Sequence, residues 1–90
     1  NLYEPYQKVE VDGCVIHVNK RKEINNYAAR YMYCGPTGLQ SPDEQYDEFY
    51  MYSKKALNAI EQISKCKIIP ESIHEGGPPK NVSVAVNCEG

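Results

Sequence analysis

The sequence predicts a small α+β domain, in which two helices cover one face of an antiparallel sheet and two disulfides hold the domain together. β-rich runs lie near both ends of the chain, and two stretches with the apolar spacing of helices lie between them. The chain also has four cysteines in 90 residues and no Cys-x-x-Cys pair. This even count is typical of a disulfide framework rather than of a metal site or a redox motif.

Length and charge limit the possible functions. A chain of 90 residues forms one domain, 1–90, whose core is small enough for disulfides to matter. The net charge of −2 provides no overall basic field for nucleic acid, and no apolar run approaches the length of a membrane span. Because disulfides persist in oxidising compartments, we expect a secreted protein. The start at Asn1 without methionine suits a mature secreted chain, although a trimmed chain would start in the same way.

The sheet is expected to begin with a hairpin over 7–18. Asp12-Gly13 between two β-rich runs is typical of a type I′ turn. A two-residue turn sets the register and places the apolar residues of both strands on one face, namely Val9, Val11, Cys14, Ile16 and Val18. The other face then carries Lys8, Glu10, Val15 and His17.

Residues 20–34 are predicted to form the first helix, with Asn19 as its N-cap. The apolar residues follow the i, i+3, i+4, i+7 spacing of one helical face, namely Ile24, Tyr27, Ala28 and Tyr31. Gly35 and Pro36 would end this helix.

The second helix is predicted over 41–65. It begins with a capping box, Ser41-Pro42-Asp43-Glu44. An apolar stripe follows, namely Tyr46, Phe49, Tyr50, Ser53, Leu57, Ile60 and Ser64, widened by Ala56 and Ile63. Residues 67–80 are rich in Pro and Gly and are expected to form an ordered loop with a short strand at 67–69. Alternating valines over 81–88 predict the last strand of the sheet.

The order of these elements suggests how the cysteines pair. The first helix would pack back over the hairpin and bring Cys34 near Cys14, while the second helix would end near the last strand, where Cys66 could meet Cys88. We therefore prefer the pairs Cys14–Cys34 and Cys66–Cys88. Four cysteines nevertheless allow three connectivities, and the sequence alone does not choose between them.

A basic end is the first candidate binding site. Lys20, Arg21 and Lys22 lie together at the predicted start of the first helix, and the topology adds Lys65 and Lys67. The acids of the second helix's first turns would lie at the opposite end. Such a basic end could steer a phosphate or an acidic partner, although an ordinary solvated face has the same composition.

Tyrosines and histidines supply the other candidates. The chain has eight tyrosines, and we expect Tyr33 and Tyr52 to point outward, where they would suit a protein-binding surface or pack in part against neighbours. His17 and His74 are the two histidines, and His74-Glu75 lies in the predicted loop, where functional residues often occur. An exposed loop pair without function is the alternative interpretation. No residues have the spacing of metal ligands or of a phosphate-binding loop, so we expect no cofactor.

A hairpin that carries Cys14, followed by a helical pattern with Ile24 and Ala28-Ala29, resembles the opening of the fungal guanyl-specific ribonucleases. It is more similar still to the ribonuclease-like secreted effectors of plant-pathogenic fungi. The Gly/Pro-rich segment 76–82 is similar to the loop ahead of their central strand. The catalytic Glu, Arg and second His of that family have no counterparts in this chain, so the resemblance implies a non-catalytic member. Small α+β killer toxins offer a second similarity, of scaffold alone.

We therefore expect a secreted, non-enzymatic effector, toxin or inhibitor that binds a host or target protein. The alternative is a ribonuclease-like protein that binds or cleaves RNA, using His17 or His74 with Glu75 and the basic end. A membrane-active protein fits poorly because the net charge is negative. Monomer and dimer both remain open, as does glycosylation of the sequon Asn81-Val82-Ser83.

Overall fold

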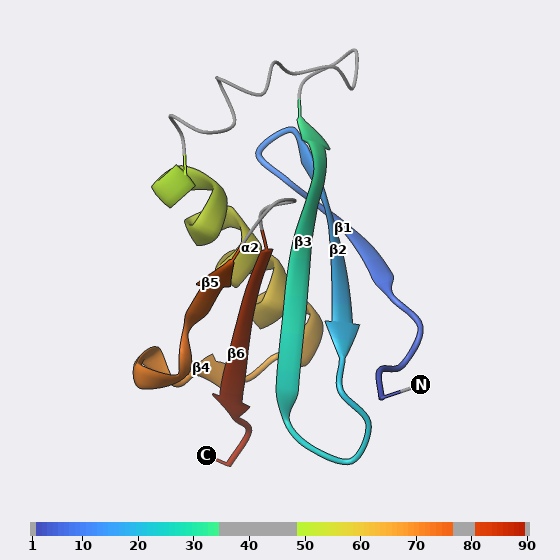
Figure 1. Ribbon diagram of the computed structural model, residues 1–90, viewed down its shortest axis with the longest axis vertical. Helices are drawn as coiled ribbons and strands as arrows, with labels where there is room; N and C mark the ends of the chain where they lie inside the picture. Colours follow the sequence, from blue (N-terminus) through green and yellow to red (C-terminus); the bar gives the residue numbers. More distant parts are fainter. Residues whose placement is uncertain (1, 35–48, 77–80, 90) are drawn as a thin grey trace.

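A six-stranded antiparallel sheet with helix α2 packed against it forms the domain (Figure 1). The computed structural model describes residues 2–34, 49–76 and 81–89. The elements in these ranges are β1 (Gln7–Val11), β2 (Cys14–Lys20), β3 (Asn26–Cys34), α2 (Phe49–Ser64), β4 (Lys67–Ile68), the 3-10 turn η1 (Pro70–Ser72), β5 (His74–Gly76) and β6 (Asn81–Asn87). The strand order is β1-β2-β3-β6-β4, and β5 also pairs with β6. The α+β class and the antiparallel sheet are confirmed.

The hairpin of β1 and β2 forms as predicted. Asp12 and Gly13 have φ angles of 49° and 78°, and both central residues of a type I′ turn require such positive values. Val11 lies opposite Cys14 in the predicted register. The predicted apolar face is the buried one, with Val9, Val11, Cys14, Ile16 and Val18 all in the core.

The helix predicted over 20–34 is wrong, because most of this segment is strand β3. Tyr27 and Ala29, two residues apart, are both buried, and Tyr31 packs against the same core. Tyr27, Ala29 and Tyr31 therefore follow the period of a strand, whereas only Tyr27 and Tyr31 also fit that of a helix. Since β3 pairs with β2 on one side and with β6 on the other, hydrogen bonds on both of its edges favour the strand.

A β-bulge changes which way the end of β3 faces. Val15 lies opposite Tyr33 while Ile16 lies opposite Tyr31, so Met32 is an extra residue between them. Without this extra residue, Tyr33 would share the core side with Tyr31. The bulge instead turns Tyr33 to the opposite side of the sheet, where it is 40% exposed.

Helix α2 covers one face of the sheet. Ala56, Ala59 and Ile60 are at most 2% exposed and pack in one cluster with the inward-facing valines of β6, Val82, Val84 and Val86. This confirms the predicted helix over the residues that the structure describes, although Ala59 was absent from the predicted stripe. The predicted capping box and Tyr46 lie outside the described residues.

Of the segment predicted as an ordered loop over 67–80, the described residues 67–76 contain more regular structure than the one short strand expected. β4 confirms the short strand at its start, and β5 adds a second strand on the same edge of β6. Ser72 ties the turn between them to the sheet: its hydroxyl donates to the carbonyl of Ile69 at 2.6 Å and accepts from the amide of Ala85 at 2.8 Å.

One predicted disulfide is confirmed. Cys66, just beyond α2, is bonded to Cys88, just beyond β6, with 4.6 Å between their Cα atoms. In the other preferred pair, Cys14 lies directly opposite Cys34 in the register of β2 and β3. None of the helices in the described ranges is both long and apolar enough to cross a membrane.

Candidate binding face

The sheet has a second face, which no described element covers (Figure 1). Side chains alternate between the two faces along a strand, and directly opposed residues of neighbouring strands share a face. Because the core valines lie under α2, the residues next to them in sequence lie on the other side. We call this side the uncovered face; its members are Tyr3, Tyr6, Lys8, Glu10, Val15, His17, Asn19, Arg21, Asn26, Ala28, Arg30, Tyr33, His74, Asn81, Ser83 and Ala85.

The register arranges these side chains in rows across the strands. One row contains Lys8, His17, Arg30 and Asn81. The next row contains Asn19, Ala28, Ser83 and His74. The two central residues of the second row are small, so the surface is lower there than along the first row.

A hollow of ≈ 450 Å³ lies over these small residues. The residues that line it are Tyr3, Asn19, Ala28, Ala29, Arg30, Asn81 and Ser83. The side-chain Nδ2 of Asn19 donates to the backbone carbonyl of Glu4 at 3.3 Å. This hydrogen bond holds the N-terminal segment beside the hollow. Its volume falls within the range of ligand sites, although it is open to solvent and its lining is largely polar.

Cations prevail on the uncovered face. In the part of the chain that the structure describes, this face carries three cations, Lys8, Arg21 and Arg30, and one acid, Glu10. The whole chain, in contrast, has a net charge of −2. In the described ranges, one ion pair is closer than 4.0 Å: Lys20 Nζ lies 3.7 Å from Glu4 Oε2. This pair involves none of the three cations of the uncovered face. An anion on the uncovered face would therefore meet cationic groups that no described carboxylate neutralises.

His17 adds an aromatic group rather than a charge. Its ring stacks on that of Tyr6, with centroids 4.0 Å apart and planes 11° from parallel. Partial burial lowers the pKa of His17 below 6.5, and the nearby charges of Lys8 and Arg30 lower it further. The imidazole is therefore neutral at pH 7. Because the folded pKa is the lower one, this group favours folding above about pH 6.5, and its contribution is lost as the pH falls through the folded pKa.

Replacing Lys8 with glutamine is expected to raise the pKa of His17 toward 6.5, because one of the two neighbouring cations is removed. NMR titration of the imidazole protons measures this pKa in the folded protein. Lys22→Gln, which removes an exposed cation in the turn before β3, is the matched control and should leave the titration unchanged. A wild-type pKa at or above 6.5 would contradict the placement of His17.

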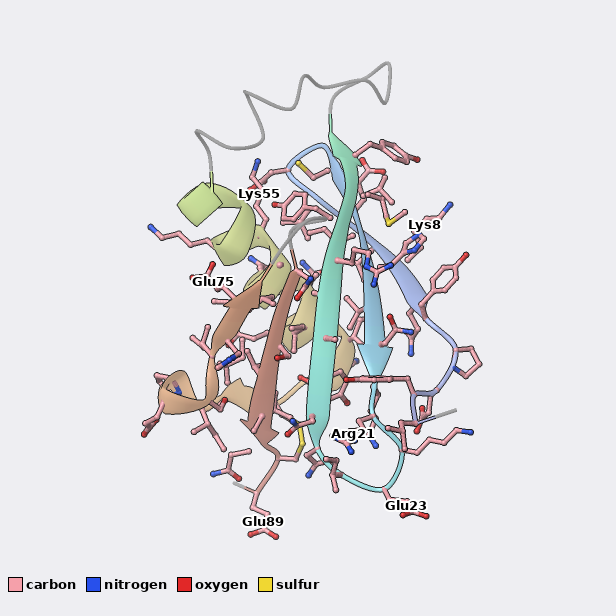
Figure 2. The ribbon with its side chains drawn as sticks, in the orientation of Figure 1. Lys8, Arg21, Glu23, Lys55, Glu75 and Glu89 are labelled. Carbon is pink, nitrogen blue, oxygen red and sulfur yellow. A yellow bond between two sulfur atoms is a disulfide. The ribbon has the colours of Figure 1, made fainter. Side chains whose placement is uncertain are left out.

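The three cations predicted to form a basic end, Lys20, Arg21 and Lys22, separate in the structure. Lys20 pairs with Glu4 and also donates to the carbonyl of Arg21 at 3.2 Å. Arg21 lies on the uncovered face, because its backbone forms a β-bridge with Tyr3, a residue that lines the hollow. Figure 2 shows Glu23 and Glu89 at the same end of the molecule as Arg21, so this end carries both signs of charge.

The other predicted site residues, like the cations, do not all lie on one surface. Tyr33 lies on the uncovered face, whereas the side chain of Tyr52 lies outside the described residues. His74 lies opposite Ser83 on the uncovered face, and its neighbour Glu75 lies opposite the core residue Val82. Since adjacent residues of a strand face opposite sides, His74 and Glu75 do not face a common group.

Sequence reasoning missed Arg30, Asn19 and Ser83 because it placed the first two beside or on a helix. A strand over 26–31 would have shown the pattern, since Asn26, Ala28 and Arg30 alternate with the buried residues between them. Asn81 and Ser83, which both line the hollow, also belong to the sequon, so a glycan on Asn81 would stand at the rim of the hollow.

In the described ranges, no three side chains of His, Cys, Asp or Glu gather closely enough to hold a metal ion. Comparison with known proteins adds no relative: no family model, no curated protein and no solved structure matches the chain.

Proposed function

We propose that the chain is a secreted, non-enzymatic domain, an effector, toxin or inhibitor, that binds a host or target protein through its uncovered face. The observation that carries this proposal is a hollow lined by Tyr3 and Arg30 on a polar face that also carries Lys8, Arg21 and Tyr33. Tyrosine and arginine are enriched at the centres of protein interfaces, where a few of them supply most of the binding energy.

The charge of the face favours an acidic partner. Lys8, Arg21 and Arg30 are spread along it, and tyrosines lie at both of its ends, Tyr3 beside the hollow and Tyr33 beyond the bulge. Complementary charge would speed the encounter with an acidic surface, and the tyrosines would supply apolar contact area.

The placement of the histidines supports a non-enzymatic role. His17 is on β2 and His74 on β5, with β3 and β6 between them. Three strand spacings separate β2 from β5 by about 14 Å, which is too far for both rings to act on one atom. Glu75, the carboxylate next to His74 in sequence, lies on the other side of the sheet.

Binding or cleavage of RNA is the second candidate. It is favoured by one observation: a neutral imidazole, that of His17, stands in the same row as Lys8 and Arg30, which could hold a phosphate beside a base. Incubating the purified protein with RNA tests it, and we expect no cleavage. Cleavage that is lost in His17→Ala or His74→Ala, with the fold intact by circular dichroism, would overturn the non-enzymatic proposal.

Protein binding is tested by affinity capture from extracts of the host or target, followed by quantitative mass spectrometry. We expect the wild-type chain to enrich specific proteins about tenfold or more over Arg30→Ala/Tyr33→Ala, because interface arginines and tyrosines are frequent hot spots. Lys54→Ala/Glu61→Ala, which changes two exposed residues of α2, is the matched control and should capture as the wild type does. Equal capture by all three proteins would refute a role for the uncovered face.

A second disulfide, Cys14–Cys34, completes the proposed secreted form. The two residues are directly opposed on antiparallel strands, where Cα atoms lie about 4.5 to 5.5 Å apart, within the range that disulfides span. No cysteine in the described ranges is a free thiol. We expect the mass of the unfolded chain to rise by about 4 Da on reduction, two hydrogens for each of two bonds. A rise of about 2 Da would contradict the second bond.

A further inference from the structure

We infer that the hollow on the uncovered face is a carboxylate-recognition subsite, which receives an acidic peptide segment of the partner with Arg30 as the principal donor. This inference rests on the proposed protein-binding function and names the chemistry of the segment that is bound. Arg30, Ser83 and Ala28 contribute to one hollow from two adjacent strands, β3 and β6.

The donors at the hollow suit a carboxylate. An arginine presents a planar set of N–H groups that can bind both oxygens of a carboxylate at once. Arg30 is exposed, and no carboxylate in the described ranges lies within 4.0 Å of it. The hydroxyl of Ser83, one strand away and also at the hollow, can donate a further hydrogen bond.

The size of the hollow indicates a segment rather than a lone ion. A space of ≈ 450 Å³ is far larger than a carboxylate needs. Ala28 and Tyr3 give the lining one apolar and one aromatic residue, and these could contact the residue next to the acid. The occupant is therefore expected to combine an acidic side chain with an aromatic or apolar neighbour.

The number of cations favours a peptide over a nucleic-acid strand. Among the described residues, the uncovered face has the cations Lys8, Arg21 and Arg30, together with the acidic Glu10. Binding to a phosphate backbone depends mainly on the number of phosphates that Lys and Arg neutralise. The stacked ring of His17 adds no charge at pH 7. Three cations suit one or two carboxylates better than a polyanion.

Titration of the ¹⁵N-labelled, non-glycosylated protein by NMR tests the subsite. The probe is the blocked peptide acetyl-Gly-Glu-Tyr-Glu-Gly-amide, and its control has glutamine in place of both glutamates. We expect the glutamate peptide to shift the amides of Ala28, Arg30 and Ser83, and the glutamine peptide to bind about tenfold more weakly, because a charged hydrogen bond is lost. Arg30→Gln should weaken the glutamate peptide by a similar factor, whereas Lys54→Gln on α2 should not.

Further arms distinguish other ligands. Inorganic phosphate should shift the same amides only weakly, and a short single-stranded oligouridine should bind less tightly than the glutamate peptide. Equal affinity for both peptides, shifts confined to α2, or tighter binding of oligouridine would overturn the inference. If Tyr33→Ala reduces capture of partners from an extract while Arg30→Gln does not, the proposed protein-binding function stands and the carboxylate subsite fails.

Discussion

Ile60→Ala is expected to lower the free energy of unfolding by about 3 to 4 kcal/mol. Ile60 is 0% exposed and lies between α2 and the sheet, in contact with a cluster that includes Ala56 and Val84. Truncation removes three buried carbons and leaves a cavity between α2 and the sheet, which the surrounding core residues fill only in part. The loss is a large share of the about 5 to 15 kcal/mol that stabilises a typical domain. Urea denaturation followed by circular dichroism measures it.

Ile24→Ala is the matched control, because it is the same substitution at a position that is 45% exposed in the turn between β2 and β3. Its expected cost is under about 1 kcal/mol. If the two variants lost equal stability, α2 would not pack on the sheet as described.

Replacing both cysteines of the confirmed disulfide, Cys66→Ser with Cys88→Ser, is expected to cost about 3 kcal/mol. The bond closes a loop with a sequence separation of 22, and its removal increases the conformational entropy of the unfolded chain. It also releases the end of α2 from the strand that lies beneath it. The midpoint of urea denaturation should fall accordingly.

Little apolar burial is lost in this double variant, because Cys66 is half-buried and Cys88 exposed. The expected cost therefore comes mainly from the cross-link. As a control, the wild-type protein under reducing conditions should show at least the same loss. A loss below about 1 kcal/mol in the double variant would contradict a structural role for the bond.

Elements with strong local signals could be predicted from the sequence. Asp12-Gly13 dictates the first hairpin through its own backbone preferences, and the register follows from the length of the turn. The alternating valines of β6 have no competing helical pattern. The confirmed disulfide was predicted because both of its cysteines flank elements of this kind, Cys66 after α2 and Cys88 after β6.

Strand β3 could not be predicted in the same way. Tyr27 and Tyr31 are four residues apart, which is a multiple of two and also close to one helical turn, so both periods include them. Pairing with β2 and β6 decides between the two, and β6 lies some fifty residues further along the chain. The candidate site was missed for the same reason, because Arg30 reaches the hollow only when 26–34 is a strand.

The β-bulge at Met32 could not be predicted either, for a similar reason. A bulge depends on how two strands fit in register, and no residue of β3 signals it by type. Its consequence is large, since it turns Tyr33 to the uncovered face and leaves Cys34 opposite Cys14.

The central claim, that the partner binds the uncovered face, is tested most directly by site-specific photo-crosslinking. Tyr33→p-benzoylphenylalanine places the photoreactive group on this face, and Glu61→p-benzoylphenylalanine places it on the exposed side of α2. Irradiation in an extract that contains the captured partner should give a covalent adduct with the partner from position 33 and none from position 61. An adduct from position 61 alone would contradict the account.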